Sequence, residues 1–477
     1  MGIKVLFIYP NTYGMNMLPP AIALFSALLN REGHEVKLFD STYYSTNYGI
    51  DSDGRKAEHL NVVPFNPDDR GIKMRTTDWR DDISNMAKSF NPDLIAISST
   101  EDMWQLGIQL IEEIEGFITK NKIPVIAGGV FPTFAPQLAI KHRLVSMVGI
   151  GEGENTLLDL CDCIDRGKSY EHVTNLWIKQ KDGAIRENPI TKPVDIDSNP
   201  IIDLSLFEEQ RLLRPMVGKW YRMLPSETMR GCPYTCTYCN SPSQMSLYKT
   251  EANANFFRKR KMEAIHRELS YFKNTIKAEY IYFTADTFLA WSSEEFEEFC
   301  DMYSEIKLPF WFNTRPETIS DYRMKRLAEV GLHRMNFGIE HGNEEFRARV
   351  LDRRWSNAET IETLKSPHRY GVQFSANNIT GLPEETRELA MDTVELNRFI
   401  ESDNQNLYAF MPFHGTPLRK KAESLGMVEA DSICKSVTDK HNGTPGYSSE
   451  EIEGLLKCFA LYVKFPRNRW KEIERAE

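Results

Sequence analysis

The segment 230–240 reads Arg230-Gly-Cys-Pro-Tyr-Thr-Cys-Thr-Tyr-Cys-Asn240 and carries three of the eight cysteines of this 477-residue chain. Cys232, Cys236 and Cys239 have the spacing C-x3-C-x2-C. Three thiolates on one short loop can bind a soft metal or an iron–sulfur cluster and leave one coordination position open. A structural zinc site needs a fourth Cys or His nearby. The next histidine, His266, comes 27 positions after Cys239, so the spacing favours a catalytic cluster.

Strand-like and helix-like segments alternate on the N-terminal side of this loop. The apolar runs of strand length are residues 4–9, 35–39, 94–98, 125–127 and 145–150. The amphipathic stretches between them are 83–90, 104–118 and 156–164. This alternation is typical of a parallel sheet covered by helices, and it predicts one α/β domain over residues 1–165. The polar segment 43–77 interrupts the pattern as a long excursion or lid.

A second series begins next to the cysteine loop, after a proline-punctuated linker with a small hairpin at 166–225. Its expected strands are 227–230, 280–284, 310–313, 334–339, 373–380 and 407–412. Its expected helices are 262–273, 293–304, 320–330 and 386–399. Six strand–helix units predict an open or closed α/β barrel over 226–420. The remaining residues, 421–477, look helical, and the length fits about three domains.

The cysteine loop and four later motifs carry a family resemblance. The segment Glu227-Thr-Met-Arg-Gly-Cys-Pro-Tyr-Thr-Cys-Thr-Tyr-Cys resembles the cluster loop of radical S-adenosylmethionine (SAM) proteins that follow an N-terminal cobalamin-binding domain. The later motifs come in the family's order: FTADTF at 283–288, GIEHG at 338–342, ITGLPE at 379–384 and PFHGTPL at 412–418. The resemblance spans roughly residues 1–420. It implies a doubly wound Rossmann-like cobalamin-binding domain and a partial (β/α)6 radical SAM barrel, and we expect a small α-helical C-terminal region after them.

The resemblance also implies the chemistry. The three cysteines would hold a [4Fe-4S] cluster, and one electron from it would cleave SAM to methionine and a 5′-deoxyadenosyl radical. Residues at strand ends line the site in such barrels. The expected SAM contacts are Tyr238, Arg315, Glu340, Asn377 and Ile379. Asn377 stands where related enzymes have an acidic residue, and Asp286 is expected to organise the second loop rather than to contact SAM.

Cobalamin is expected at the carboxyl ends of the N-terminal strands, where parallel sheets bind ligands. Gly128-Gly129 would let the backbone approach a bulky ligand closely. The segment 149–154 lacks the G-x-G-x-x-G spacing, which argues against a nucleotide loop. The expected cobalamin contacts are Asn11, Thr12, Tyr13, Ser98, Ser99, Thr100, Trp104, Gly128, Gly129, Val130, Gly151 and Glu152.

The loop after the first strand departs from the pattern D-x-H-x-x-G that many cobalamin domains carry. Residues 10–17 contain no histidine. We therefore expect base-off cobalamin without a histidine ligand, which would favour low-valent cobalt and methyl transfer. Asn11, Tyr13 or Met15 could approach the lower face of the corrin.

The leading functional hypothesis is a cobalamin-dependent radical SAM methyltransferase that moves a methyl group from methylcobalamin to an unactivated carbon. The alternative is a cyclase or rearrangement enzyme with the same cofactors and no net methylation. A zinc or iron–sulfur binding module without catalysis is a third class. An external one-electron reductant, such as a flavodoxin or ferredoxin, is the expected partner. The substrate would be a small molecule or a peptide, with His414 and Tyr408 as candidate contacts and the segments 43–77 and after 420 as specificity elements.

Composition sets further limits. The net charge of −10 disfavours nucleic acid, because phosphate binding needs clustered Lys and Arg. No apolar run is long enough to span a bilayer, and no secretory signal opens the sequence, so we expect a cytoplasmic protein. The five cysteines outside the cluster loop are then expected to be ordinary thiols: Cys161, Cys163, Cys300, Cys434 and Cys458.

Overall fold

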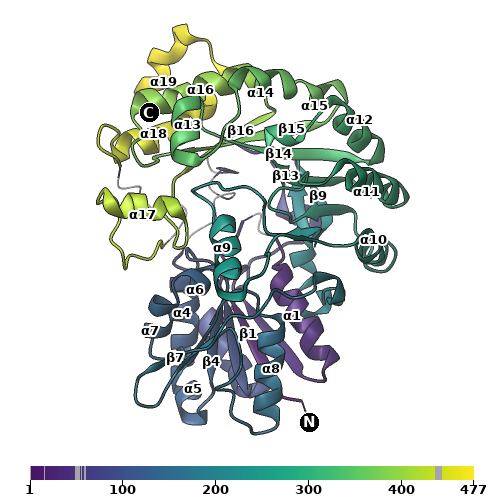
Figure 1. Cartoon of the computed structure of the whole chain (residues 1–477), viewed down its shortest axis with the longest axis vertical. Coiled ribbons are helices and arrows are strands. Elements are labelled where there is room, and N and C mark those ends of the chain that lie inside the picture. Colours follow the sequence, from purple (N-terminus) through teal and green to yellow (C-terminus); the bar gives the residue numbers. More distant parts are fainter. Residues whose placement is uncertain (1, 15–16, 49–53, 55, 58–60, 436–442) are drawn as a thin grey trace.

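The computed structural model describes residues 2–14, 17–48, 54, 56–57, 61–435 and 443–477. It consists of two sheets with their helices, the N-terminal one below and the barrel-like one above, in the view of Figure 1. Helix α9 (Ser241–Ala252), which follows the cysteine loop, lies between them. Among the described residues, no helix has the length and apolar character that crossing a membrane requires.

The lower sheet has the order β2-β1-β3-β4-β5-β6-β7, and its first five strands are parallel. These strands are β1 (Lys4–Tyr9), β2 (Glu35–Asp40), β3 (Leu94–Ser98), β4 (Val125–Gly128) and β5 (Met147–Gly149). The predicted hairpin is β6 (Leu176–Lys179) and β7 (Ile185–Glu187). Because β6 pairs antiparallel with β5, the hairpin extends this sheet and is not part of a free linker.

Helices cover both faces of the lower sheet. Alternate residues of β1, such as Val5 and Phe7 on one face and Leu6 and Ile8 on the other, belong to two separate cores. The first core includes α1 (Pro20–Arg31) and α8 (Glu154–Asp165). The second includes α3 (Trp79–Phe90), α4 (Trp104–Glu113), α5 (Glu115–Asn121), α6 (Val130–Phe134) and α7 (Pro136–Lys141). The single helix expected over 104–118 is therefore two, because Ile114 makes a tight turn by donating its N–H to the oxygen of Ile111.

The upper sheet has the order β16-β15-β14-β13-β12-β9-β8, in which only the edge strand β8 is antiparallel. The strands are β8 (Leu213–Met216), β9 (Lys219–Ser226), β12 (Tyr280–Phe283), β13 (Phe310–Thr314), β14 (Leu332–Glu340), β15 (Gln373–Thr380) and β16 (Asn404–Ala409). The six parallel strands do not close, since β8 and β16 are free edges of the sheet. The prediction of a doubly wound domain followed by a partial (β/α)6 barrel is therefore confirmed.

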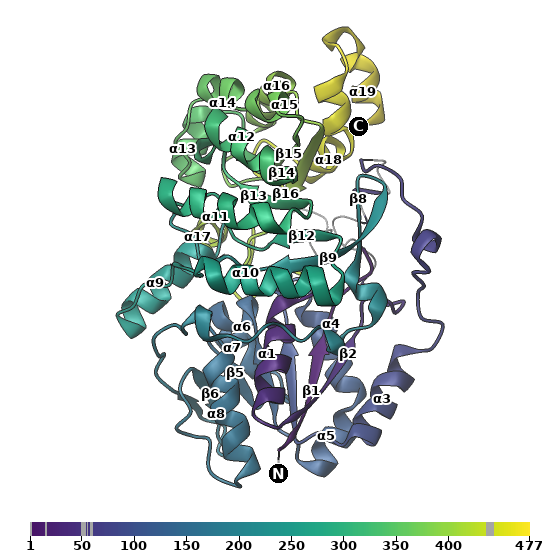
Figure 2. The ribbon, with the colours of Figure 1, turned by 90° about the vertical axis from the view of Figure 1, so that its right-hand side faces the viewer.

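Helices cover the outer face of this partial barrel, as Figure 2 shows for α10 and α11. They are α10 (Met262–Tyr271), α11 (Ser293–Ile306), α12 (Asp321–Val330), α13 (Glu344–Leu351), α14 (Asn357–Thr363), α15 (Ser366–Arg369) and α16 (Arg387–Ile400). The helix α17 (Pro417–Ser424) lies beside the cysteine loop and packs against α13. The chain ends in α18 (Ser449–Lys464) and α19 (Trp470–Ala476), which confirms the helical character predicted for the tail. Ile452, Leu455 and Phe459 of α18 pack against Val394 of α16, so the tail is joined to the barrel by a shared core.

Two of the predicted barrel strands were wrong in position. The first was expected at 227–230, but it is β9, and Met229–Arg230 forms β10, which pairs with β11 (Arg258–Lys259) in a separate ribbon. Pro225 suggested a linker, yet it lies in β9 beyond the last residue paired with β8, where its missing N–H is not needed. The last strand was expected at 407–412, but it spans Asn404–Ala409. The prediction missed its beginning because the first three residues of the strand are all polar.

Candidate active site

The cysteine loop lies between β10 and α9 and presents three sulfurs with hydrogen-bond donors around them. Cys236 Sγ accepts a hydrogen bond from Arg315 Nη1 at 3.2 Å, and Cys239 Sγ accepts one from the backbone N–H of Ser241 at 3.5 Å. Cys232 Sγ lies 3.4 Å from Thr287 Oγ1. Donors around sulfur stabilise thiolates, so this set of three sulfurs fits the ligands of an iron–sulfur cluster.

Burial favours the protonated form of two of the three thiols. It raises the pKa of the Cys232 thiol and raises the pKa of Cys239 to about 11. Binding to iron must therefore displace protons, as at other thiolate sites. In the described part of the chain, no three His, Cys, Asp or Glu side chains converge as one metal ion would require. The cysteines thus suit ligands of separate irons better than ligands of a single zinc ion.

Three of the five expected SAM contacts gather beside Cys236. Tyr238 Oη donates to Glu340 Oε1 at 2.9 Å, and Arg353 Nη1 donates to both groups, at 2.9 Å and 3.1 Å. Burial raises the pKa of Glu340, and the neighbouring Arg353 opposes that rise. Arg315 binds Glu317 as well as Cys236, and Glu317 lies 3.9 Å from Arg353. The result is one buried polar cluster at the carboxyl ends of β13 and β14.

The other two expected SAM contacts separate. Ile379 packs in the same apolar group as Tyr238 and so lies near the polar cluster. Asn377 faces the barrel interior instead, where its Oδ1 accepts a hydrogen bond from Asn406 at 2.8 Å. Sequence reasoning missed Arg353 and Glu317, which lie outside the family motifs and carry no signal beyond their charge.

A cavity of about 510 Å³ reaches from the lower sheet to the cysteine loop. Its inner end is apolar and is formed between β1, α1 and α8 by Phe7, Leu24, Phe25 and Leu157. Its mouth combines strand-end residues of the lower sheet with residues of the cysteine loop and its surroundings. These are Ser98, Gly128, Gly129, Val130, Gly151, Glu152, Cys239, Asn240, Ser241 and Asp286. Six of the expected cobalamin contacts thus line one cavity with one expected cluster ligand.

The paired glycines at this mouth have different roles. A Cβ built on Gly128 would meet no atom within 4 Å, so the backbone there is open to a ligand. Gly129 has a φ of +113°, and a Cβ there would collide with the backbone oxygen of Ser99. A cavity with an apolar inner end and a bare backbone at its mouth fits a bulky ligand such as cobalamin.

The remaining expected cobalamin contacts lie outside this lining. Asn11 is buried, and its Nδ2 donates to Thr42 Oγ1 at 2.8 Å. Thr12 and Tyr13 follow in the same loop, with the Tyr13 ring 6.2 Å from that of Tyr43. Thr100 accepts a hydrogen bond from Ser99 Oγ. Trp104 is 3% exposed and packs against Phe131, so it is a core residue and does not flank the cavity. Met15 lies outside the described residues.

The two candidate substrate contacts have different surroundings. His414 lies at the junction of the domains, where Nδ1 is 2.8 Å from Oε1 of Glu101 and the ring packs against Phe131. Glu101 also accepts N–H groups from His414 and Cys434, so it fastens the loop after β16 to the lower domain. Tyr408 instead lines a second cavity of about 630 Å³ inside the barrel.

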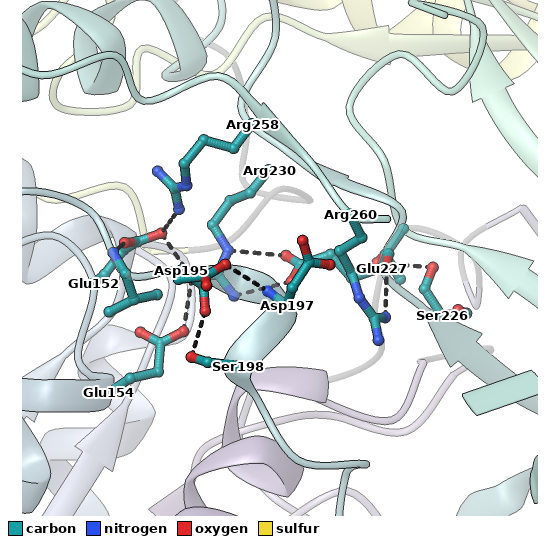
Figure 3. A network of polar contacts seen from close by, with 12 residues as sticks. Glu152, Glu154, Asp195, Asp197, Ser198, Ser226, Glu227, Arg230, Arg258 and Arg260 are labelled. Carbon is teal, nitrogen blue, oxygen red and sulfur yellow. Dashed lines mark hydrogen bonds and ion pairs between the residues drawn. The ribbon is translucent and has the colours of Figure 1, made fainter. Parts of the chain in front are cut away.

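An ion network next to the first cavity joins the two domains (Figure 3). Arg230 Nη1 lies 2.7 Å from both Glu152 and Glu154 of the lower domain, and Arg230 Nη2 lies 2.9 Å from Glu227. Arg258 also pairs with Glu152. Burial disfavours the charge of Arg230, but these carboxylates outweigh it and raise its pKa. Glu152, expected as a cobalamin contact, thus has its carboxylate engaged by two arginines.

The cysteines outside the loop are all free, as expected. Burial raises the pKa of both Cys161 and Cys300 to about 12. Such thiols are poor nucleophiles at neutral pH, which fits ordinary packing roles.

Two family models match the chain. Residues 226–396 match the radical SAM superfamily, and residues 63–161 match the B12 binding domain. An uncharacterized methyltransferase of Pyrococcus horikoshii is 25% identical over 398 residues, 82% of this chain and 83% of that protein. The cytidylyl-2-hydroxyethylphosphonate methyltransferase of Streptomyces wedmorensis is 20% identical over 94% of this chain and 87% of that protein. The anaerobic magnesium-protoporphyrin IX monomethyl ester cyclase of Rubrivivax gelatinosus is 22% identical over 70% and 59%.

Solved structures share the fold. The radical SAM methyltransferase TsrM from Kitasatospora setae, with cobalamin and a [4Fe-4S] cluster bound, superposes with a TM-score of 0.67 at 16% identity. The match covers 98% of this chain and 92% of TsrM. The cobalamin-dependent SAM radical enzyme OxsB, with aqua-cobalamin and SAM bound, gives 0.61 at 15% identity, over 98% of this chain and 62% of OxsB.

Proposed function

Because this chain is a B12-binding radical SAM enzyme with a [4Fe-4S] cluster, SAM and cobalamin as cofactors, we propose that it methylates an unactivated carbon of its substrate. One observation carries the proposal: a single cavity runs from the apolar pocket of the B12-binding domain to Cys239 of the cluster loop. This cavity brings the expected cobalamin site and the expected cluster site next to each other. Two relatives named as methyltransferases cover more than four fifths of this chain, which supports methyl transfer over the other reactions of such enzymes.

The side chains have distinct tasks in this proposal. When bound, the cluster supplies the electron that cleaves SAM, and cobalamin supplies the methyl group. Cys232, Cys236 and Cys239 hold the cluster. Tyr238 and Glu340 contact SAM, and Arg353 fixes the rotamers of both through the hydrogen bonds described above.

Further SAM contacts come from the same region. Arg315 is placed to bind the methionine carboxylate, since its guanidinium lies next to Cys236 and a planar fork suits a carboxylate. Ile379 supplies an apolar contact beside Tyr238, and Asn377 an amide toward the barrel interior.

Cobalamin is held by the mouth of the cavity in this proposal. The backbone at Gly128, Gly129 and Gly151 approaches the ligand, and the apolar residues between α1 and α8 receive its inner part. The loops after β1 and β3, with Asn11 to Tyr13 and Ser98 to Thr100, lie at the same edge of the sheet and complete the contact. Residues 10–17 offer no imidazole to cobalt, which we propose leaves it without a histidine ligand.

The test is anaerobic turnover with methyl-deuterated SAM, a one-electron reductant and a small-molecule cell extract as the source of substrate. We expect a product that has gained a deuterated methyl group, together with 5′-deoxyadenosine. An unlabelled, rearranged product would instead support the cyclase alternative, which the similarity to the magnesium-protoporphyrin cyclase keeps open. Replacing chemical reductant by flavodoxin or ferredoxin tests the proposed external electron donor.

A further inference from the structure

The second cavity is built from the inward-facing residues of the barrel strands. Alternating residues along part of β13, β14, β15 and β16 face this chamber of about 630 Å³. These residues are Trp311, Asn313, Arg334, Asn336, Gln373, Ser375, Asn377, Asn404, Asn406 and Tyr408. Neutral amides dominate the wall, and several bond to one another: Asn336 donates to Asn313 at 3.1 Å, and Asn406 donates to Asn377 at 2.8 Å.

Trp311 and Asn406 each carry a buried polar group that has no hydrogen-bond partner among the described residues. The Nε1–H of Trp311 is one, and the residue is 7% exposed. The Oδ1 atom of Asn406 is the other, in a residue that is 5% exposed. An unpaired buried polar atom costs roughly 1–3 kcal/mol, so such groups are normally satisfied by a ligand or water. The chamber thus presents one donor and one acceptor to whatever fills it.

The guanidinium of Arg334 faces the same space, which Lys56 and Arg214 also line, and it forms no ion pair among the described residues. Arg334 donates to Gln373 Oε1 at 3.1 Å and to Ser375 Oγ at 3.0 Å, both of which are neutral. Within the described residues, no carboxylate oxygen lies within 4.0 Å of its nitrogens. Asp403, which also lines the chamber, is occupied by the backbone N–H of Phe374 and by His368. Burial lowers the pKa of Arg334, so an anion bound beside it would be favourable.

We propose that this chamber is the substrate-binding site and that Arg334 binds an anionic oxygen group of the substrate, a carboxylate or a phosphoryl group. Trp311 and Asn406 then meet an acceptor and a donor elsewhere on the same molecule. The inference rests on the proposed function in that the ligand is taken to be the substrate. Among the expected substrate contacts, Tyr408 belongs to this site and His414 does not.

The segment expected as a lid closes one side of the chamber. Asn61, Val62, Val63 and Phe65 line it, and Asn61 Nδ2 donates to the backbone oxygen of Gln405 at 3.1 Å. Beyond the chamber, Figure 2 shows the segment passing along the side of the molecule between the lower domain and β8. The site therefore combines barrel strands with a segment inserted from the B12-binding domain, so the insert contributes to specificity.

The test measures binding of inorganic phosphate and of acetate to the full chain reconstituted with cluster and cobalamin, by ligand-observed NMR. We expect Arg334→Gln to weaken anion binding by about tenfold or more, because a charge-assisted hydrogen bond is lost. Gln373→Glu keeps the arginine and gives it a carboxylate partner at the exposed rim, so it should weaken anion binding in a protein that folds normally. Arg326→Gln, on the outer helix α12, is the matched control and should bind as the wild type does.

The anion that binds more tightly identifies the class: phosphate indicates a phosphoryl substrate and acetate a carboxylate. Absence of binding to the wild type, or equal binding by the wild type and Gln373→Glu, would overturn the inference. Neither result depends on the labelling experiment. A deuterated product with no anion binding refutes only the site, and anion binding with an unlabelled product refutes only methyl transfer.

Discussion

The two cavities described above differ in how they are built. The first lies between the domains, where the strands of the lower sheet end, and its wall combines apolar side chains and bare glycine backbone with the buried ion pairs around Arg230. The second lies inside the barrel, and its walls are the inward faces of strands that carry amides and a guanidinium. Helices cover both faces of the lower strands, so a ligand can bind only at the ends of these strands. An open barrel has an inner face that can itself carry recognition groups. We conclude that the first cavity suits a large constant cofactor and the second a specific polar substrate.

The largest effect is expected at the cluster loop, where the first cavity meets the barrel. Cys239→Ala removes a cluster ligand and should abolish formation of 5′-deoxyadenosine, measured by chromatography after anaerobic incubation with SAM and dithionite. Bound cobalamin should remain, because most of its expected contacts are on the other domain. The control is Cys300→Ala, a buried cysteine of α11 far from any cluster motif. SAM cleavage by Cys239→Ala would show that the cysteine assignment is wrong.

The next effect separates the two cavities directly. Gly128→Phe places a ring in the open mouth of the first cavity, and we expect cobalamin affinity to fall by about ten- to a hundredfold. SAM cleavage should continue, since the polar cluster around Glu340 is untouched. Gly116→Phe is the matched control, because a Cβ there also meets no atom within 4 Å, but it lies on α5 outside the cavity. The cobalamin retained after desalting is measured by its absorbance. Equal retention by both variants would show that cobalamin does not bind at this mouth.

The sequence predicts the lower sheet well and the barrel less evenly, for a physical reason. Strands buried on both faces, such as 94–98, appear as continuous apolar runs with sharp ends, and β3 matches that prediction. The barrel strands carry polar residues on their inner face, so the polar start of β16 at Asn404 was not predicted as part of a strand. In β9, Pro225 suggested a linker instead of a strand. The three expected cluster ligands are close together in sequence, and their spacing together with the family resemblance predicted them.

The side-chain pairs around the two cofactor sites join residues that are distant in sequence, and the sequence did not predict them. Arg353 meets Glu340 across 13 positions, Arg230 meets Glu152 across 78, and Glu101 meets His414 across 313. Each pair depends on how two elements pack, and no local pattern encodes such packing. The chamber was missed for the same reason, since it needs four strands aligned before its inner face exists.

A third prediction concerns the ion network around Arg230 that joins the two domains. Arg230→Met leaves Glu152 and Glu154 buried with less positive charge, which we expect to lower the free energy of unfolding by about 3–5 kcal/mol. Denaturant unfolding of the cofactor-free protein measures it. Arg143 is the comparison, because it also bridges two glutamates, Glu112 and Glu115, but at the surface. Arg143→Met should leave the unfolding midpoint unchanged, and equal effects of the two substitutions would mean that the buried network is not special.

The smallest effect is expected at the lid of the barrel chamber. Asp82 Oδ2 accepts hydrogen bonds from Thr77 Oγ1 at 2.5 Å and from Tyr44 Oη at 2.8 Å, so it ties together the two ends of the insert. These bonds, Thr77 first, lower the pKa of Asp82 from its ordinary value of 3.8. A carboxyl whose pKa is lowered by folding stabilises the fold above its unfolded pKa. That contribution is lost as the pH falls through the lower, folded value.

Asp82→Asn should therefore loosen the insert at pH 7 by less than about 1 kcal/mol, since solvent screens this exposed carboxylate. Hydrogen exchange of peptides covering residues 61–77 measures the change. The difference between wild type and variant should shrink as the pH falls below 3.8 and through the lowered pKa of Asp82, because the wild-type carboxylate then becomes protonated. A difference that persists unchanged at low pH would mean that the charge of Asp82 does not hold the lid. The chamber would then owe its closure to other contacts of the segment, such as those of Lys56 with Tyr408 and of Asn61 with Gln405.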